Sequence, residues 1–214
     1  MKKGNFIIIT GTDGSGKTTL INQLKSENLP NYIFLKTPLP PFDKFRNIFT
    51  ENESHNPNLT FPFFQRALKN DLLYVKQLIE SGRNVVMERY IETTWNFYLT
   101  SCDYNNCPKD LNLLDKDFPT PDKRIILTAP TSVRLKRCML RKELDWWENT
   151  EFQENFQNML LSENLPNTVF FDSYQNGKRD LKNLVLLELQ KPCYICSQPF
   201  LSRNFYMKNK FRNR

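Results

Sequence analysis

A glycine-rich segment near the start of the chain carries the residues best suited to bind phosphate. Residues 11–18 fit the pattern G-x-x-x-x-G-K-[ST] at every fixed position. Glycines let backbone N–H groups turn inward around an anion, and the N-terminus of a following helix adds positive potential. We therefore expect ATP to bind at Gly11, Thr12, Asp13, Gly14, Ser15, Gly16, Lys17, Thr18 and Thr19.

Two side chains of this loop have predicted roles in phosphoryl transfer. Lys17 would reach the terminal phosphates, and the Thr18 hydroxyl would ligate Mg²⁺. Position 15 is serine, so the loop supplies no arginine to the transferred group. An arginine from elsewhere in the chain would have to neutralise the charge that develops there.

A charged segment follows the strand predicted at residues 84–87. Its residues are Glu88, Arg89 and Tyr90. The carboxyl end of a parallel strand is where such folds place ligands, so we expect these side chains to face the bound nucleotide. A surface Glu–Arg pair is the alternative.

An aromatic segment lies early in the longest predicted helix. It reads Phe63-Phe64-Gln65-Arg66. A guanidinium at Arg66 can donate to a carbonyl of a nucleobase. The two phenylalanines could equally belong to the core, so this segment leaves both roles open.

Three arginines on a later predicted helix could supply the missing positive charge. They are Arg134, Arg137 and Arg141, and the sequence Glu143-Leu144-Asp145-Trp146-Trp147-Glu148 follows them. Residues four positions apart share a helical face, so the second and third arginines could converge on the transferring phosphoryl group. A solvated basic helix is the alternative.

Taken in this order, the motifs resemble those of the thymidylate kinase branch of nucleoside monophosphate kinases, over residues 5 to about 190. The resemblance implies that Asp13 contacts the sugar hydroxyl of the acceptor and that Arg89 binds its phosphate. It also implies that an aromatic residue and an arginine hold the base. The acceptor site expected from it comprises Asp13, Lys36, Phe64, Arg66, Glu88, Arg89 and Tyr90.

The resemblance further implies a small helical lid over residues of about 134–150, with Arg137 and Arg141 as catalytic groups beside Lys17. Two positions depart from the family pattern. Glu88 stands where the family has aspartate, as in related deoxynucleoside kinases, and Trp146 stands where an arginine is common.

The activity that the resemblance implies is ATP- and Mg²⁺-dependent phosphorylation of dTMP to dTDP, a step in dTTP synthesis. A deoxynucleoside kinase is one alternative, and a P-loop protein that binds nucleotides without efficient transfer is another. The expected partners are small-molecule nucleotides. The resemblance leaves a homodimer open.

The end of the second predicted strand helps to separate a nucleoside acceptor from a monophosphate acceptor. A neutral hydroxyl needs a nearby carboxylate to take its proton, whereas a phosphate oxygen is already anionic. The strand ends Leu35-Lys36-Thr37-Pro38, with no acid before the proline. Lys36 suits an anionic acceptor, which favours the monophosphate.

The elements that must position these groups alternate along the chain. Short apolar runs predict strands at residues 5–10, 32–35, 84–87, 124–128 and 168–171. Helical spacing appears at residues 17–26, 60–81, 91–103, 131–144, 148–162 and 178–190. This alternation predicts an α/β P-loop NTPase fold, with a doubly wound parallel sheet of five strands flanked by helices and a small helical lid.

Length and composition agree with one kinase domain over residues 1–190. The chain has 214 residues, and none of its apolar runs approaches the roughly 18 that a membrane span requires. We expect no membrane association and a cytoplasmic location, since no secretory segment precedes the loop and five cysteines make no disulfide framework.

The net charge of +7 lies mostly in a basic tail at residues 191–214, which holds six basic residues and no acidic one. We expect this tail to be disordered, and we therefore expect no nucleic acid among the partners. Cys193 and Cys196 form a C-x-x-C pair, while Cys102 and Cys107 are spaced too loosely for a convincing zinc site.

Overall fold

The computed structural model describes residues 2–50, 56–101, 118–141, 147–162 and 165–191. Its five strands form a single parallel sheet in the order β2-β3-β1-β4-β5. The strands are β1 (Phe6–Gly11), β2 (Tyr32–Lys36), β3 (Asn84–Glu88), β4 (Lys123–Thr128) and β5 (Thr168–Asp172). The five-stranded parallel sheet expected from the sequence is therefore confirmed.

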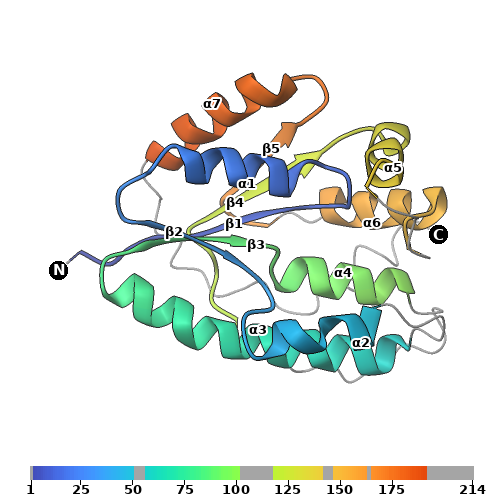
Figure 1. Cartoon of the computed structure of the whole chain (residues 1–214), viewed down its shortest axis with the longest axis horizontal. Coiled ribbons are helices and arrows are strands. Elements are labelled where there is room, and N and C mark those ends of the chain that lie inside the picture. The colour runs from blue at the N-terminus through green and yellow to red at the C-terminus, as the bar shows by residue number, and fades with distance from the viewer. Residues whose placement is uncertain (1, 51–55, 102–117, 142–146, 163–164, 192–214) are drawn as a thin grey trace.

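Helices cover both faces of this sheet, as Figure 1 shows. The described helices are α1 (Lys17–Ser26), η1 (Phe42–Phe45), α2 (Arg46–Thr50), α3 (Pro57–Glu80), α4 (Ile91–Ser101), α5 (Thr131–Met139), α6 (Thr150–Ser162) and α7 (Gly177–Gln190). Helices α1 and α7 lie on one face, and α3 and α4 lie on the other (Figure 1).

The alternation of side chains along β1 explains why both faces are buried. Ile7 and Ile9 pack toward α1 and α7, whereas Phe6 and Ile8 pack toward α3 and α4. All four side chains are buried. A third apolar cluster, Trp147, Phe152, Phe156 and Leu160 with Phe97 against it, joins α6 to α4.

Helices η1 and α2 were not expected from the sequence. They follow a proline-rich segment and are four and five residues long, too short for a helical period to show. The ends of longer helices also differ from the prediction. Helix α3 begins earlier, at Pro57, where Asn56 accepts from the backbone N–H of Asn58, and α5 ends at Met139.

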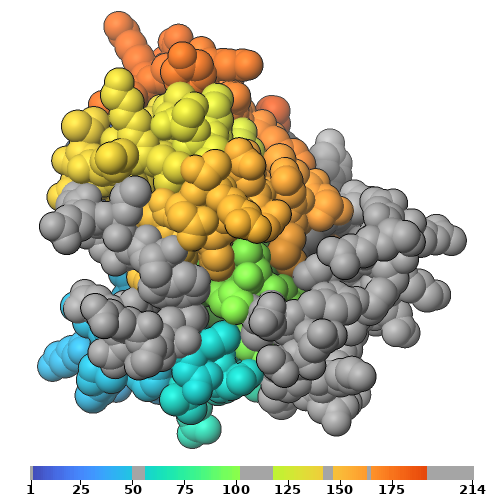
Figure 2. Space-filling model, turned by 90° about the vertical axis from the view of Figure 1, so that its right-hand side faces the viewer, coloured from blue at the N-terminus to red at the C-terminus, as the bar shows by residue number. Residues whose placement is uncertain are grey.

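The carboxyl ends of all five strands point to one edge of the molecule, which Figure 2 views directly. Helices α5 and α6 lie on one side of this edge, and α2 and the start of α3 lie on the other (Figure 2). The loops after β1 and β3 meet here, because neighbouring strands in the centre of the sheet are followed by helices on opposite faces. None of the helices among the described residues has the length and apolar character of a membrane span.

Candidate active site

The loop after β1 is held tightly between the sheet and α5. Gly11 and Gly14 have positive φ values of 143° and 73°. A Cβ atom at either position would lie 2.3 Å from a backbone oxygen, that of Leu127 or that of Arg134 respectively. Only glycine fits such contacts, so β4 and α5 fix the path of the loop.

Lys17 is the first residue of α1, and its side chain folds back into the loop. Its Nζ donates to the carbonyl of Thr12 at 2.7 Å and lies 4.0 Å from Asp13 Oδ1. Burial and then the nearby charge of Arg89 lower the pKa of Lys17 to about 7, although Asp13 and Glu88 oppose the shift. The ammonium is therefore poised to gain stability from an incoming anion.

Thr18 and Glu88 bring two oxygen ligands to the other side of the loop. The exposed Thr18 hydroxyl donates to Glu88 Oε1 at 3.3 Å, and the glutamate is buried at the end of β3. Hydroxyl and carboxylate oxygens are ligands that Mg²⁺ prefers, so this pair fits the metal expected from the sequence. In the described segments, no group of three or more acidic, cysteine or histidine residues is placed so that it could hold a metal ion.

Arg89 lies just beyond β3 and donates a hydrogen bond to Asp13. Its backbone is in the left-handed region, with φ of 70°, and its N–H donates to the carbonyl of Ile9. Burial opposes ionisation of the Asp13 carboxyl, but the charges of Arg89 and Lys17 outweigh it and hold its pKa well below the usual range. The nearby side chain of Trp147 also helps to lower the pKa of this carboxyl.

Two pockets open at this edge of the sheet. The phosphate-loop pocket is lined by the loop, the first turns of α1 and residues that follow β3, α5 and β5. Seven of its lining side chains are cationic, against the two carboxylates Asp13 and Glu88. The cations are Lys17, Lys36, Arg46, Arg89, Arg137, Arg141 and Lys178. This pocket is built for a polyanion.

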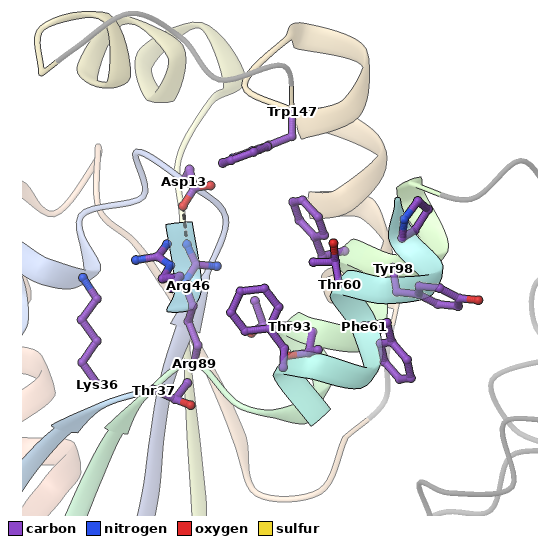
Figure 3. A pocket seen from close by; sticks show the side chains of 14 residues that line it. Asp13, Lys36, Thr37, Arg46, Thr60, Phe61, Arg89, Thr93, Tyr98 and Trp147 are labelled. Carbon is purple, nitrogen blue, oxygen red and sulfur yellow. Dashed lines mark hydrogen bonds and ion pairs between the residues drawn. The ribbon is translucent and has the colours of Figure 1, made fainter. Parts of the chain in front are cut away.

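The aromatic pocket lies between α3 and α4, with Trp147 above it (Figure 3). Its walls are formed by Phe61, Phe64, Phe97, Tyr98 and Trp147. Flat, apolar walls of this kind suit a planar ring. Among its described lining residues, the charged side chains lie at one end of the pocket.

Four residues line both pockets and therefore mark the place where they join. They are Asp13, Lys36, Arg46 and Arg89. Figure 3 shows the two arginines side by side below Asp13, with Lys36 reaching from the end of β2. A group passed from one pocket to the other would cross a position surrounded by three cations.

Comparison with known proteins identifies the family of this chain. The family model described as thymidylate kinase matches residues 9–184, which is most of the chain. The chain belongs to the thymidylate kinase family. It is therefore a nucleoside monophosphate kinase, an enzyme of the phosphotransferase class.

Its relatives are moderately similar. The chain is 30% identical over 157 residues to a probable thymidylate kinase of Methanosphaera stadtmanae, which covers 70% of this chain and 78% of the relative. It is 25% identical over 177 residues to the thymidylate kinase of Acinetobacter baumannii, with 74% and 87% covered.

Two solved structures share the fold. The thymidylate kinase of Candida albicans superposes with a TM-score of 0.70 at 20% identity, covering 88% of this chain and 92% of that one. The Ehrlichia chaffeensis enzyme gives a TM-score of 0.64 at 17% identity, covering 88% and 99%.

Within this thymidylate kinase fold, two of the three expected lid arginines line the phosphate-loop pocket. Arg137 donates to the Gly14 carbonyl and to Ser173 Oγ, both at 3.0 Å. Arg141 lines the phosphate-loop pocket and donates to Cys138 Sγ at 2.9 Å. Both therefore add positive charge to the phosphate-loop pocket.

Arg134 has a different position. It is fully buried and donates to the carbonyl of Ala129, to Thr131 Oγ1 and to both the side chain and the carbonyl of Gln153. Gln153 in turn donates to the carbonyl of Trp147 at 2.9 Å. The structure corrects the expectation for Arg134, because its donors hold α6 and Trp147 against α5 and none faces the pocket.

Two residues expected at the acceptor also lie elsewhere. Tyr90 is fully buried in the core against Phe6, and its hydroxyl donates to the carbonyl of Pro119. Arg66 is exposed on α3 and lines neither pocket. The structure thus corrects both placements. Phe64, Lys36 and Asp13 line the aromatic pocket, whereas Glu88 lines the phosphate-loop pocket alone.

The remaining loop residues divide into buried ones and ones that line the phosphate-loop pocket. Gly11, Thr12 and Ser15 are the buried residues of the loop. Thr19 lines the phosphate-loop pocket together with Thr18. Phe63 stacks on Phe49 with ring centres 4.1 Å apart, which leaves Phe64 as the pocket residue of the pair.

Several lining residues were missed by the sequence analysis. Arg46 lies on α2, a helix with no readable signal in the sequence. The residues that α4 contributes could have been found, because a helix that starts directly after Glu88-Arg89-Tyr90 must begin at the same edge of the sheet. These missed α4 residues are Thr93, Thr94, Phe97 and Tyr98.

The four cysteines considered for zinc, Cys102, Cys107, Cys193 and Cys196, lie outside the described residues, as does the basic tail after residue 191. Of the expected lid, residues 142–146 also lie outside them, Trp146 included.

Proposed function

We propose that this chain transfers the γ-phosphoryl group of Mg²⁺-bound ATP to dTMP, giving ADP and dTDP. The observation that carries the proposal is the set of four residues shared by both pockets, three cations and one carboxylate. A 5′-phosphate in the aromatic pocket would meet Lys36, Arg46 and Arg89 at the point where it faces the donor.

The transfer depends on positioning the two substrates and neutralising the charge of their phosphates more than on proton transfer. An oxygen of the dTMP phosphate forms a bond to the γ-phosphorus, and the bond from that phosphorus to the β–γ bridging oxygen breaks, leaving ADP. Lys17, Arg137 and Arg141 would neutralise charge around the transferred group from the loop and from the end of α5. The metal, held at Thr18 and Glu88, would supply further charge neutralisation at the ATP phosphates.

A nucleoside acceptor fits this site less well. Its neutral 5′-hydroxyl would need a carboxylate base, and Asp13 is the one acidic residue among the described residues of the aromatic pocket. That carboxylate is bound to Arg89, which helps to hold its pKa well below the usual range. A carboxylate so stabilised is a poor proton acceptor.

A protein that binds nucleotide without transfer is also less well supported. Such a protein needs no cations around the γ-phosphate beyond those of the loop. Here Arg137 on α5 and Arg141 just after this helix line the phosphate-loop pocket, and from there they would stabilise the transition state.

An assay of ADP release with ATP and Mg²⁺ tests the proposal, using dTMP and thymidine as acceptors in parallel. We expect dTMP to be preferred in kcat/KM by about a hundredfold or more, because only the monophosphate engages the shared cations. Preference for thymidine would refute the proposal and favour the deoxynucleoside kinase.

A further inference from the structure

The aromatic pocket is polarised along its length. Its charged lining residues are the four that join it to the phosphate-loop pocket, and its opposite walls consist of α3 and α4. If the proposed function is correct, the acceptor phosphate lies at the charged end, and the base lies between these two helices beside Phe64. The chemistry of that far end then decides which bases are accepted.

No cation or amide is found at the base end among the described lining residues. Arg66, the one guanidinium on α3, is exposed and outside the pocket. Leu68, one turn after Phe64, belongs to the core. The amides Gln65 and Asn96 are buried on the same helices and do not line the pocket. The polar groups that remain are hydroxyls.

Most of these hydroxyls are already engaged within the protein. Thr60 Oγ1 donates to the carbonyl of Asn56 at 3.1 Å, and the hydroxyl of Thr93 is paired with that of Thr10. The Tyr98 hydroxyl points away from the cavity (Figure 3) and donates to Asn58 Oδ1 at 3.2 Å. At the phosphate end, the Thr37 hydroxyl donates to Asp71 at 2.6 Å.

Thr94 is the exception. It lines the pocket from α4, is only partly buried, and its hydroxyl has no hydrogen-bond partner among the described residues. This hydroxyl is therefore available to a ligand in the space between the two helices.

A hydroxyl and a guanidinium can form different hydrogen bonds with the edge of a pyrimidine. A guanidinium only donates, so it bonds to the 4-carbonyl of thymine and is left unpaired by the 4-amino group of cytosine. A threonine hydroxyl donates or accepts as it rotates, and it satisfies either group at little cost. A site with hydroxyls alone cannot strongly reject the other base.

We propose that this kinase phosphorylates deoxypyrimidine monophosphates with either a carbonyl or an amino group at position 4, dCMP as well as dTMP, and that Thr94 contacts the edge of the base. The reaction is the same in both cases, with ATP giving its γ-phosphoryl group to the acceptor phosphate. The inference rests on the proposed function and extends its range of acceptors.

The test measures kcat and KM of the full chain for dTMP and dCMP by ADP release, with the rate without acceptor subtracted. We expect the two values of kcat/KM to lie within about tenfold of one another. A dTMP preference of about a thousandfold or more would overturn the inference and leave the proposed function standing. Turnover of thymidine with neither monophosphate would refute both.

Variants of Thr94 test the assigned contact. Thr94→Val keeps the shape and removes the hydroxyl, so KM should rise roughly fivefold for both acceptors while kcat changes little. Thr94→Ser should restore both KM values. The matched control is Thr100→Val on the same helix, whose hydroxyl donates to Asn96 and does not line the pocket. If Thr94→Val behaves like this control, or affects one acceptor alone, the assignment is wrong.

Discussion

The guanidinium of Arg89 donates to the carboxylate of Asp13 at the place where the phosphate-loop pocket and the aromatic pocket meet. The two residues are 76 positions apart and follow the neighbouring central strands β3 and β1. Because both residues line both pockets, a change to either residue alters the charge of both substrate sites.

Replacement of Arg89 should weaken use of the acceptor most. Arg89→Ala removes one of the three shared cations. We expect the loss of kcat/KM for dTMP to correspond to about 2–4 kcal/mol of lost transition-state stabilisation. ATP affinity should change less. Arg89→Lys keeps the charge but not the bidentate guanidinium, so its kcat/KM for dTMP should lie between those of the wild type and Arg89→Ala. An equal loss of ATP affinity would mean that Arg89 serves the donor.

The state of Lys17 predicts a proton uptake when nucleotide binds. With its pKa near 7 in the empty site, Lys17 is mostly neutral at about pH 8.5, and the phosphates of ATP favour its charged form. Titration calorimetry in buffers of different ionisation enthalpy should show about one more proton taken up by the wild-type protein than by Lys17→Met.

At about pH 5.5 the Lys17 side chain is already protonated in the empty protein, so this difference from the variant should vanish. A difference that does not change with pH would contradict the lowered pKa. The Lys17→Met variant should also lose transfer while its unfolding stays cooperative, because Lys17 contacts only the loop and the site.

Arg134 and Arg137 should separate into a structural and a catalytic residue. Arg134→Met leaves buried acceptors on Ala129 and Gln153 without donors, so the free energy of unfolding should fall by about 3 kcal/mol. Arg137→Gln should change it by about 1 kcal/mol or less and should lower kcat about a hundredfold. Chemical denaturation and steady-state rates measure the two effects, and the reverse outcome would contradict our assignment.

The charge of Lys36 should matter more than its shape. Lys36 is exposed at the end of β2 and lines both pockets. We expect Lys36→Glu to reduce kcat/KM for dTMP more than Lys36→Gln, since it adds repulsion to a lost attraction. Equal effects of the two variants would indicate that the acceptor phosphate binds away from this residue.

The phosphate loop and the sheet could be predicted because their signals are local. Gly11 to Thr18 form a contiguous motif, and the strands are short apolar runs bounded by turns. Arg46 could not be predicted, because it depends on a five-residue helix after a proline-rich segment. Sequence spacing contains no period for so short an element.

Tyr90 and Arg134 were predicted at the site wrongly, because sequence periodicity alone does not determine where their side chains point. Tyr90 follows Arg89, whose left-handed backbone breaks the alternation of β3, so its side chain turns into the core. Arg134 and Arg137 lie nearly one helical turn apart on α5, yet of their two side chains only that of Arg137 reaches the loop. Which of two such cations is buried depends on the packing of α6, and that is tertiary information.

The left-handed backbone at Arg89 gives this position an evolutionary consequence. A non-glycine residue there costs on the order of 1 kcal/mol or more, and the fold retains it with an arginine at the centre of the site. Arg89→Gly should therefore unfold at a higher temperature than Arg89→Ala, although both lack the guanidinium. In a descendant relieved of selection for kinase activity, we expect drift at this codon toward glycine or asparagine.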